Sequence, residues 1–493
     1  MRIAVVHGYF LGDSGSGVYT RNLARELRED GHDVILFCQE REPANYSFID
    51  SLWTLDATNT ALQLVGEERP RHGEGSCRLV RPDLGGRLLV YVDGPFAGFE
   101  TSEVKTFQDA PDEWIDSYIE ANVAALRTAF SKWEPDIVLA QHAVMQPHVV
   151  RRALRGACPY TVTTHGSELN FSLKLDPRLA GFGVSGLSGA QAVVAVSPAS
   201  AEDVIGWAAS HDLDIAEKTT VIAPGVDTAT FVPAPDRATA IEKLAAHVDL
   251  PDDFELSPGD EVLAFVGRVG WNKGIQHAVV ALSLVSAVRP RVKLLVAGEG
   301  PARAALMRLA SLFSAGDATG ARKLATGEHE LRTTAEYGPL VPEDVEALGQ
   351  ARVAFLGHLT TPKVARVFAA ADIALAPSVF PEAAALVTSE GLSSGALPIV
   401  TYQTGLRMLA DIESTALGDP LFRALQPGRG LSTGLAEAIT RNLDRYPTAD
   451  NEFRRRLHRI AVEHFPSWLA VARRNVELAT QAREARAGGS RPT

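Results

Sequence analysis

The sequence predicts an α/β protein of two domains, each a parallel sheet covered by helices. The first observation is length, because 493 residues exceed what one hydrophobic core usually organises. The second is that short apolar runs of strand type alternate with helical segments, which is the pattern of βαβ units. The third is that this alternation occurs twice along the chain, with a proline-rich stretch between the two halves.

The first predicted domain opens with a βαβ unit. Residues 3–6 form a short apolar run of strand type, followed by a glycine-rich turn at residues 8–17. Leucines at helical spacing predict a helix over residues 18–30, which Gly31 ends. The apolar run at residues 34–37 is predicted to be the next strand, so the sheet is expected to be parallel.

An irregular stretch follows at about residues 40–109, with many turn residues and one expected strand at 88–92. We interpret it as an elaboration of the first domain. The alternation then resumes with a helix at 112–133. A second helix begins at Ser197-Pro198, where serine suits the N-cap and proline the first turn. The strands expected in this part lie at residues 137–140, 160–164, 192–196 and 220–222.

The second predicted domain follows a connector at residues 223–235, which holds three prolines and one glycine and has no apolar period. A helix is expected near residues 239–247. The expected strands lie at residues 262–266, 293–297, 353–356, 373–376 and 399–401. Residues 314–341 are polar and are predicted to form a surface insertion, and the tail after about Gln481 is expected to be disordered.

The composition argues against several classes of protein. The net charge is −12, whereas nucleic-acid binders usually carry a concentrated basic surface, so no nucleic acid is expected as a partner. No apolar run approaches the ~20 residues that span a bilayer, and the first run is too short for a signal peptide. With three cysteines and no CxxC pair, reduced thiols and a cytoplasmic location are expected.

Arginines gather near the C-terminus. We expect them to form a solvated helix face, and weak peripheral contact with acidic lipid is the alternative. They are Arg454, Arg455, Arg456, Arg459, Arg473 and Arg474.

Two cations follow the first strand of the second predicted domain. Arg268 and Lys273 lie in the segment 267–274, at the carboxyl end of a parallel strand, where open α/β sheets bind ligands. Fixed cations at such an edge neutralise the charge that develops on a leaving diphosphate. The simpler interpretation is two solvated surface cations, which the flanking glycines and the tryptophan make less attractive.

Two carboxylates, Glu382 and Glu390, are separated by seven residues. If a helix begins near Ala384, Glu390 lies on it and Glu382 lies in the loop before it. The free amides of that helix N-terminus suit a phosphate, and carboxylates accept hydrogen bonds from sugar hydroxyls.

The first predicted domain carries weaker signals. Gly12, Gly15 and Gly17 would let a ligand approach the backbone, although a tight strand-to-helix turn explains them equally well. His165 ends a strand and faces the ligand edge of a parallel sheet, unless local hydrogen bonds satisfy it. For His142, by contrast, a purely structural role is the favoured interpretation.

Taken in order, these segments resemble the family-4 retaining glycosyltransferases of the GT-B fold. Each motif alone is weak evidence for the family, but their joint order across most of the chain is highly specific for it. Besides the glycine turn and the Glu-x7-Glu segment, the resemblance rests on Thr164-His165-Gly166-Ser167, Ala223-Pro224-Gly225-Val226-Asp227 with Phe231 and Pro233, Gly267-Arg268 with Lys273-Gly274, Gly298-Glu299-Gly300-Pro301, Phe355-Leu356-Gly357, Asp372 to Ser378, and Gly395 with Pro398. It implies two Rossmann-like parallel-sheet domains that face each other across a cleft.

The resemblance implies that the second domain, residues 236–464, binds the donor. Arg268 and Lys273 would hold the donor diphosphate. Glu390 would bind the ribose hydroxyls, and Glu382 would contact the donor sugar near the reacting carbon. The other implied donor contacts are the amides around Leu386 and Val387 for the phosphate, and the turn with His358 and Leu359 beside the base.

The resemblance implies that the first domain, residues 1–225, binds the acceptor. His165 would reach the donor sugar and join Glu382, Arg268 and Lys273 as the catalytic set. A C-terminal helix at about residues 465–484 would cross back to this domain. The remaining implied contacts are Gly15, Ser16 and Gly17 near the phosphate and the acceptor, with His142, Glu168 and Asn170 on the acceptor side.

One departure from the family pattern follows Glu382. The family usually has Phe-Gly at the third and fourth positions of the Glu-x7-Glu segment, where this chain has Ala384 and Ala385. Alanine restricts a backbone that glycine leaves free. The departure therefore bears on how the donor sugar is seated and on which sugar it is.

The expected function is transfer of a sugar, with retention of configuration, from a nucleotide-diphosphate sugar to a small-molecule acceptor. A UDP-sugar is favoured and a GDP-sugar is possible. No cofactor and no metal are expected, because the two cations would stabilise the leaving diphosphate. The alternatives are a nucleotide-sugar epimerase on the same fold, which needs no acceptor, and a non-catalytic protein that binds sugar nucleotides. A nicotinamide oxidoreductase is disfavoured because the GxGxxG fingerprint is missing.

Overall fold

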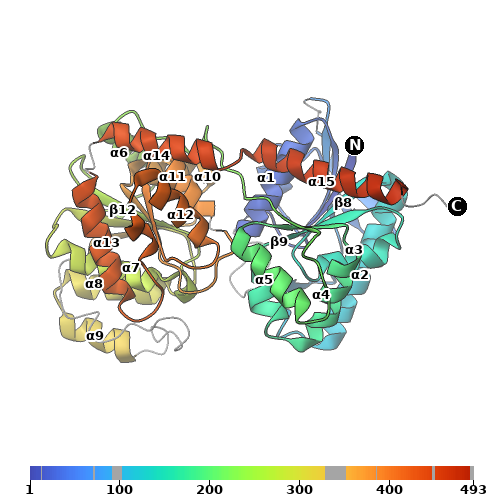
Figure 1. Ribbon diagram of the computed structural model, residues 1–493, viewed down its shortest axis with the longest axis horizontal. Helices are drawn as coiled ribbons and strands as arrows, with labels where there is room; N and C mark the ends of the chain where they lie inside the picture. Colours follow the sequence, from blue (N-terminus) through green and yellow to red (C-terminus); the bar gives the residue numbers. More distant parts are fainter. Residues whose placement is uncertain are drawn as a thin grey trace. The chain divides into compact units, whose positions relative to one another are not determined.

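The structure, a computed structural model, describes residues 1–12, 14–69, 73–91, 103–327, 351–384, 386–446 and 450–488 of the chain. The chain divides into two compact units, unit 1 (Met1–Gly225 with Pro466–Thr493) and unit 2 (Val226–Phe465). Each unit packs helices on a mainly parallel sheet (Figure 1). The predicted fold class, α/β with two parallel-sheet domains, is confirmed.

Unit 1 is built on a sheet that has nine strands within the described residues, in the order β11-β10-β9-β8-β1-β2-β5-β3-β4. Neighbouring strands are parallel except β3 and β4. Because β1, β8 and β9 are adjacent and parallel, the segments that follow them emerge at one edge. The strands are β1 (Arg2–Val6), β2 (Asp33–Phe37), β3 (Ser51–Leu55), β4 (Leu62–Val65), β5 (Ser76–Arg81), β8 (Ile137–Gln141), β9 (Tyr160–Thr164), β10 (Ala192–Ala195) and β11 (Thr219–Val221).

The stretch at residues 40–109 is more regular than predicted. It supplies β3, β4 and β5 to the main sheet, and β6 (Arg87–Val90) and β7 (Glu103–Thr106) form a separate parallel pair. The prediction missed these strands because β5 mixes basic and apolar residues and is positioned by long-range pairing with β2. The expected strand at 88–92 ends at residue 90, and Val92 lies outside the described residues.

Helix α1 (Gly15–Glu29) begins inside the predicted glycine-rich turn, which corrects the expected start at Val18. The Oγ of Ser14 accepts a hydrogen bond from the backbone N–H of Gly17 at 3.0 Å and caps the helix. Gly15, Ser16 and Gly17 therefore form the first helical turn. A Cβ on Gly17 would lie 2.7 Å from the carbonyl oxygen of Phe10, so this glycine also serves packing.

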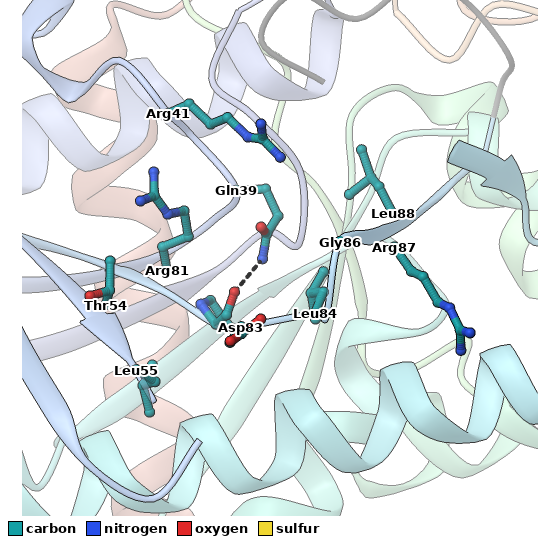
Figure 2. A pocket seen from close by; sticks show the side chains of 11 residues that line it. Gln39, Arg41, Thr54, Leu55, Arg81, Asp83, Leu84, Gly86, Arg87 and Leu88 are labelled. Carbon is teal, nitrogen blue, oxygen red and sulfur yellow. Dashed lines mark hydrogen bonds between the residues drawn. The ribbon is translucent and has the colours of Figure 1, made fainter. Parts of the chain in front are cut away.

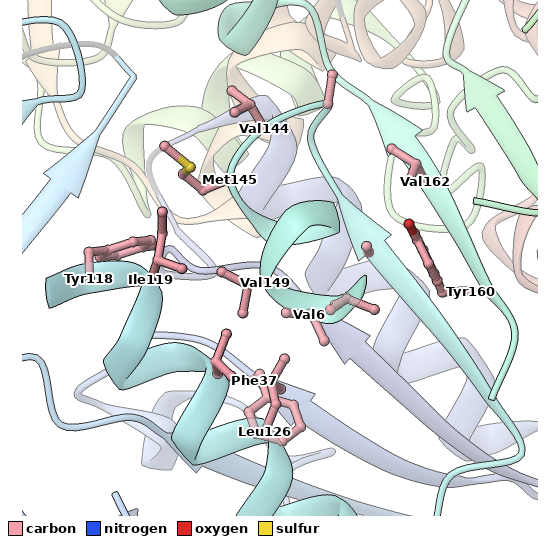
Figure 3. Close-up of a cluster of buried hydrophobic side chains, with 14 of the residues drawn as sticks. Val6, Phe37, Tyr118, Ile119, Leu126, Val144, Met145, Val149, Tyr160 and Val162 are labelled. Carbon is pink, nitrogen blue, oxygen red and sulfur yellow. The ribbon is translucent and has the colours of Figure 1, made fainter. Parts of the chain in front are cut away.

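The other helices of unit 1 are α2 (Asp112–Trp133), α3 (Gln146–Leu154), α4 (Pro177–Gly189), α5 (Pro198–Ala209) and α15 (Trp468–Gly488). Ser197 caps α5 as predicted, accepting from the backbone N–H of Ser200 at 3.1 Å. The core between sheet and helices brings Val6 and Phe37 close to Leu126 of α2 and Val149 of α3, all of them buried (Figure 3). Each such side chain contributes roughly 1.5–3 kcal/mol of hydrophobic stabilisation.

Helix α15 packs against α1. Its Arg473 pairs with Asp30 at 2.6 Å (Nη2 to Oδ1), and its Arg483 pairs with Asp136 at 3.6 Å. The helix continues through residue 488 because these contacts and the buried Ala479 hold it to unit 1. The disorder predicted after Gln481 is therefore wrong for residues 482–488, and residues 489–493 lie outside the described residues.

Unit 2 contains a sheet with the order β14-β13-β12-β15-β16, in which every neighbouring pair is parallel. Its strands are β12 (Glu261–Val266), β13 (Val292–Ala297), β14 (Val353–Gly357), β15 (Ile373–Ala376) and β16 (Leu397–Val400). Its helices, as far as the structure describes them, are α6 (Arg237–Ala245), α7 (Ile275–Ser286), α8 (Arg303–Ser314), α9 (Ala318–Gly327), α10 (Thr361–Ala370), α11 (Leu386–Ser393), α12 (Leu406–Leu417), α13 (Leu431–Arg445) and α14 (Asn451–His464).

Helix α9 falls within the predicted surface insertion at residues 314–341, so that segment is helical in part. Residues 328–341 of the predicted insertion lie outside the described residues.

Candidate active site

The loops that follow β12, β13 and β15 touch one another at the carboxyl edge of the unit 2 sheet. The backbone N–H of Val269 donates to the carbonyl of Glu299 at 2.9 Å, and that of Val379 donates to Asn272 at 3.0 Å. Gly274 has φ +68°, and a Cβ there would lie 1.8 Å from the carbonyl oxygen of Pro377. Only glycine permits both the left-handed backbone and this approach.

Lys273 and Glu382 form an ion pair at this edge. The Lys273 Nζ lies 2.6 Å from Glu382 Oε1, with side chains 32% and 16% exposed. The Ser378 hydroxyl donates to the same oxygen at 2.5 Å, and the backbone N–H of Glu382 donates to Thr404 Oγ1 at 2.9 Å. The carboxylate is thus held in one place, while part of its surface stays accessible.

Glu390 lies on α11 and Glu382 in the loop before it, as the sequence predicted. The helix begins at Leu386, close to the start near Ala384 on which this placement depended. The backbone N–H of Gly405 donates to the carbonyl of Glu382 at 2.7 Å, which holds the loop that precedes the helix. The first amides of α11 are therefore those of Leu386 and Val387. Ala385 lies outside the described residues.

The remaining predicted donor contacts lie at the same edge. Arg268 lies two residues after the end of β12 and is half-buried. His358 is exposed and Leu359 half-buried, in the short loop between β14 and α10. The strand order β14-β13-β12-β15 places these loops side by side. Unit 2 thus gathers two cations, two carboxylates and a helix N-terminus along one sheet edge.

In unit 1 the predicted His142, His165 and Glu168 meet at the ends of β8 and β9. Glu168 is fully buried, and its Oε2 lies 3.1 Å from His142 Nδ1. Its Oε1 accepts from the backbone N–H of His165 at 2.8 Å and of Ala143 at 3.2 Å. The rings of His142 and His165 lie edge to face, with centroids 4.9 Å apart. One carboxylate therefore organises both loops.

The protonation states follow from this burial. Burial would raise the pKa of Glu168, but the hydrogen bond from His142 and the charges of His142 and His165 outweigh it and lower the pKa to about 2. Burial, followed by the charge of His142, lowers the pKa of His165 to about 3. His165 is thus neutral at pH 7, and its Nε2 lies 3.0 Å from Gln141 Oε1, a carbonyl oxygen that can only accept a hydrogen bond.

His7 belongs to the same cluster, although it was not among the residues predicted from the sequence. It follows β1 directly, is buried, and stacks on His142 with ring centroids 5.4 Å apart. Its Nδ1 lies 3.2 Å from the Thr20 hydroxyl of α1. Within the described residues, Nε2 of His7 and Nε2 of His142 have no protein hydrogen-bond partner. Its position after the first parallel strand was the signal that could have identified it.

Two other predicted features of unit 1 lie apart from this hydrogen-bonded cluster. Gly15 is exposed at the first turn of α1, and a Cβ there would meet no atom within 4 Å. The side chain of Asn170 turns to Lys174, whose Nζ donates to its Oδ1 at 2.9 Å. Of the predicted acceptor-side residues, His142 and Glu168 are brought together and Asn170 is not.

Two properties of the described residues bear on ligands. They contain no group of three or more His, Cys, Asp or Glu side chains arranged to hold a metal ion. Across the same part of the chain, no helix combines the length and the apolar character that crossing a membrane requires.

Two family models match the chain. Residues 14–225 match a glycosyl transferase 4-like domain, and residues 260–444 match the glycosyl transferases group 1. Glycogen synthase 1 of Rhizobium radiobacter is 25% identical over 397 residues, which span 72% of each protein.

Solved structures share the fold. Sucrose-phosphate synthase from Thermosynechococcus elongatus superposes with a TM-score of 0.63 at 19% identity, covering 98% of this chain and 100% of that one. A structure of Anabaena HepE in complex with UDP and glucose superposes with a TM-score of 0.56 at 14% identity, covering 99% of each chain. At these identities the structural similarity shows that the GT-B fold is shared. The two family-model matches show the family to which the chain belongs.

Proposed function

Because the chain belongs to the family-4, group 1 glycosyltransferases of the GT-B fold, we propose that it moves a sugar from a nucleotide-diphosphate sugar to a small-molecule acceptor with retention of configuration. Membership makes it a nucleotide-sugar-dependent glycosyltransferase of class EC 2.4. The observation that carries the finer proposal is the fixed Lys273–Glu382 pair at the carboxyl edge of the unit 2 sheet, the edge at which Arg268 also lies.

The donor diphosphate is assigned to Arg268, Lys273 and the first amides of α11. Two cations and a helix N-terminus stabilise the negative charge that grows on the leaving group. Lys273 exchanges part of its contact with Glu382 for a phosphate oxygen when the donor binds. Glu382 then accepts hydrogen bonds from the donor sugar, and Glu390 accepts them from the ribose. The proposal requires no metal.

The transfer step needs no side-chain nucleophile. An acceptor hydroxyl oxygen bonds to the anomeric carbon on the face that the diphosphate leaves. The bond from that carbon to the diphosphate oxygen breaks, and the acceptor proton passes to a diphosphate oxygen. His165 contributes a neutral hydrogen-bonding group to the donor sugar, consistent with its pKa of about 3, which burial and the His142 charge produce. Catalysis rests on positioning and charge stabilisation.

A uridine donor is the first candidate. HepE was captured with UDP and with UDP-glucose, and the backbone contacts expected around a base do not exclude other nucleotides. Thermal-shift measurements of the full chain with UDP-, GDP- and ADP-sugars test this, because a ligand that binds only the native state raises its stability.

The reaction class is tested with the donor that the screen selects. Free nucleotide that appears only when an acceptor is present, together with a sugar-acceptor conjugate, supports transfer. Interconversion of the donor without acceptor would instead establish an epimerase. Binding without any turnover over a broad acceptor panel would point to a non-catalytic protein.

A further inference from the structure

A cavity of about 350 Å³ opens in unit 1 among the residues that end β3 and β5 and the segments that follow β2 and β5 (Figure 2). Its polar lining comes from Gln39, Arg41, Thr54, Arg81, Asp83 and Arg87. These segments leave the same carboxyl edge of the sheet as the histidine cluster, since β2 pairs in parallel with β1. Small-molecule sites commonly have volumes of roughly 300–1,000 Å³, so the cavity suits a hexose-sized ligand.

The cavity carries more positive than negative charge. Among the residues that the structure describes, Arg41, Arg81 and Arg87 line it together with one carboxylate, Asp83. Asp83 Oδ1 already accepts the backbone N–H of Gly85 at 2.8 Å. The guanidinium of Arg87 lies over the Trp114 ring, 4.7 Å from its centroid, and points away from the other two arginines (Figure 2). Arg41 and Arg81 line the cavity away from Arg87 (Figure 2).

Arg81 is held only loosely by the protein. Within the described residues it makes one hydrogen bond, a long one of 3.4 Å from Nη1 to the Glu40 carbonyl, and no ion pair. The nearby carboxylate of Glu40 is occupied by backbone amides, at 3.1 Å from Leu11 and 3.0 Å from Glu42. Burial, and then the charge of Arg41, lowers the pKa of Arg81. An anion in the cavity would relieve this repulsion.

Gln39, which lines the cavity, is hydrogen-bonded to Tyr9, whose ring lies beside the histidine cluster. The backbone N–H of Gln39 donates to the carbonyl of Tyr9 at 2.5 Å. The Tyr9 ring stacks on Tyr91 at 5.3 Å and lies 5.8 Å from the ring of His142. One backbone hydrogen bond and one aromatic ring thus connect the cavity lining to the histidine cluster.

We propose that this cavity binds the acceptor, and that the acceptor is a sugar or polyol bearing a phosphate or carboxylate group held by Arg41 and Arg81. The planar guanidinium matches both oxyanions with two parallel hydrogen bonds. Gln39 and Thr54 offer amide and hydroxyl partners for the sugar hydroxyls. That the ligand is an acceptor rests on the proposed function, whereas the binding of an oxyanion-bearing sugar does not.

Calorimetry on the full chain without donor tests the binding step. The probes are glucose 6-phosphate, glucuronate, glucose and inorganic phosphate. An anionic sugar is expected to bind at least about tenfold tighter than glucose, since charge-assisted hydrogen bonds contribute that much or more. Whether the phosphate or the carboxylate binds more tightly identifies the group on the acceptor.

Substitutions of lining residues test whether the anionic sugar binds in this cavity. Arg81→Gln and Arg41→Gln are each expected to weaken the anionic sugar about tenfold. Arg78→Gln is the matched control, because Arg78 lies on the same strand, faces Trp133 at 5.9 Å and does not line the cavity. Asp83→Asn is expected to strengthen binding about two- to threefold by removing a like charge, a gain that a damaged fold would not produce.

The outcomes separate this inference from the proposed function. Equal affinities for glucose and glucose 6-phosphate, unchanged affinity in Arg81→Gln, or inorganic phosphate binding as tightly as the sugar phosphate would each overturn it. Arginine-dependent binding without consumption of any nucleotide sugar would remove the proposed function and leave the cavity assignment standing. Transfer to neutral acceptors alone, unaffected by Arg81→Gln, would remove the cavity assignment and leave the proposed function standing.

Discussion

Glu168 and His142 form a completely buried pair in unit 1, with Oε2 of the carboxylate 3.1 Å from Nδ1 of the imidazole. The other carboxylate oxygen accepts backbone N–H groups of His165 and Ala143. A single side chain therefore ties together the loops after two neighbouring strands. Because Glu168 sets the positions of both histidines, it is a positioning residue whose removal should act on stability first.

Replacing Glu168 by Gln is expected to lower the free energy of unfolding at pH 7 by about 2–3 kcal/mol, because a buried ionised acceptor is lost. The pKa of Glu168 is lowered from 4.5 to about 2. Its ionisation therefore stabilises the fold above pH 4.5, and this contribution is lost as the pH falls through about 2. Urea unfolding should show a smaller deficit at pH 3 than at pH 7.

The control for this prediction is Glu120→Gln, whose carboxylate is 64% exposed and pairs with Arg152. It should change stability little at either pH, since exposed ion pairs contribute little. A deficit of equal size at pH 7 and pH 3 in Glu168→Gln would show that ionisation is not the cause.

Arg268→Ala and Lys273→Ala are each expected to reduce kcat/KM by about 10²–10³-fold, as removal of a group that stabilises developing charge does. Arg455→Ala removes an exposed arginine of α14 that pairs with Glu452 and serves as control. Steady-state kinetics with the donor selected by thermal shift measures the effect. Near-normal turnover in either variant would contradict the assignment of that residue to the donor diphosphate.

Gly274→Ala is expected to cost more than about 3 kcal/mol of stability, since it adds a steric clash to backbone strain. The added Cβ would lie 1.8 Å from the carbonyl oxygen of Pro377. Gly316 is the matched control: its φ of +69° is nearly the same, but a Cβ there meets no atom within 4 Å. Gly316→Ala should cost only the strain of about 1–2 kcal/mol. Equal losses of the two variants in urea unfolding would contradict the close approach.

Glu413→Gln is expected to stabilise the protein at pH 8 by about 1–3 kcal/mol, because neither carboxylate oxygen has a hydrogen-bond partner among the described residues. Burial raises the pKa of Glu413 well above 4.5. Stability linked to its protonation is therefore full below pH 4.5 and lost as the pH rises through the raised value.

The gain from Glu413→Gln should accordingly shrink as the pH is lowered from 8 to 5. Thermal or urea unfolding at both pH values measures it, with the exposed Glu437→Gln on α13 as control. A variant less stable than the parent at pH 8 would show that the buried carboxylate has a partner after all.

The positions of the candidate donor-side residues at the ends of strands could be predicted, because neighbouring residues in the sequence indicate where those strands end. Arg268 and Lys273 stand in the segment after a strand with a clear apolar run, and the parallel direction of that strand decides at which edge they emerge. α11 begins at Leu386, close to the position near Ala384 from which Glu390 was placed on the helix. The roles of these residues remain predictions that the kinetics above will test.

The acceptor-side features depend on contacts between distant residues. Arg41 and Arg81 are forty residues apart in sequence and line one cavity because β5 pairs with β2. β5 carries mixed polar and apolar residues, so its place in the sheet left no periodic signal. His7 was overlooked for a similar reason: only the adjacency of β1 and β8 brings its ring onto His142.

By itself the sequence determined the α/β class, the two parallel sheets and the order of motifs along the donor-side loops. These features follow from residues that are close together in the sequence: the spacing of apolar residues and the polar residues at the ends of strands. The tertiary structure alone decided which strands are neighbours, and with that the buried Glu168–His142 pair, the position of His7 and the arginine-lined cavity. The physical reason is that strand order is selected by packing and hydrogen bonding between segments far apart in the chain, which local sequence patterns do not record.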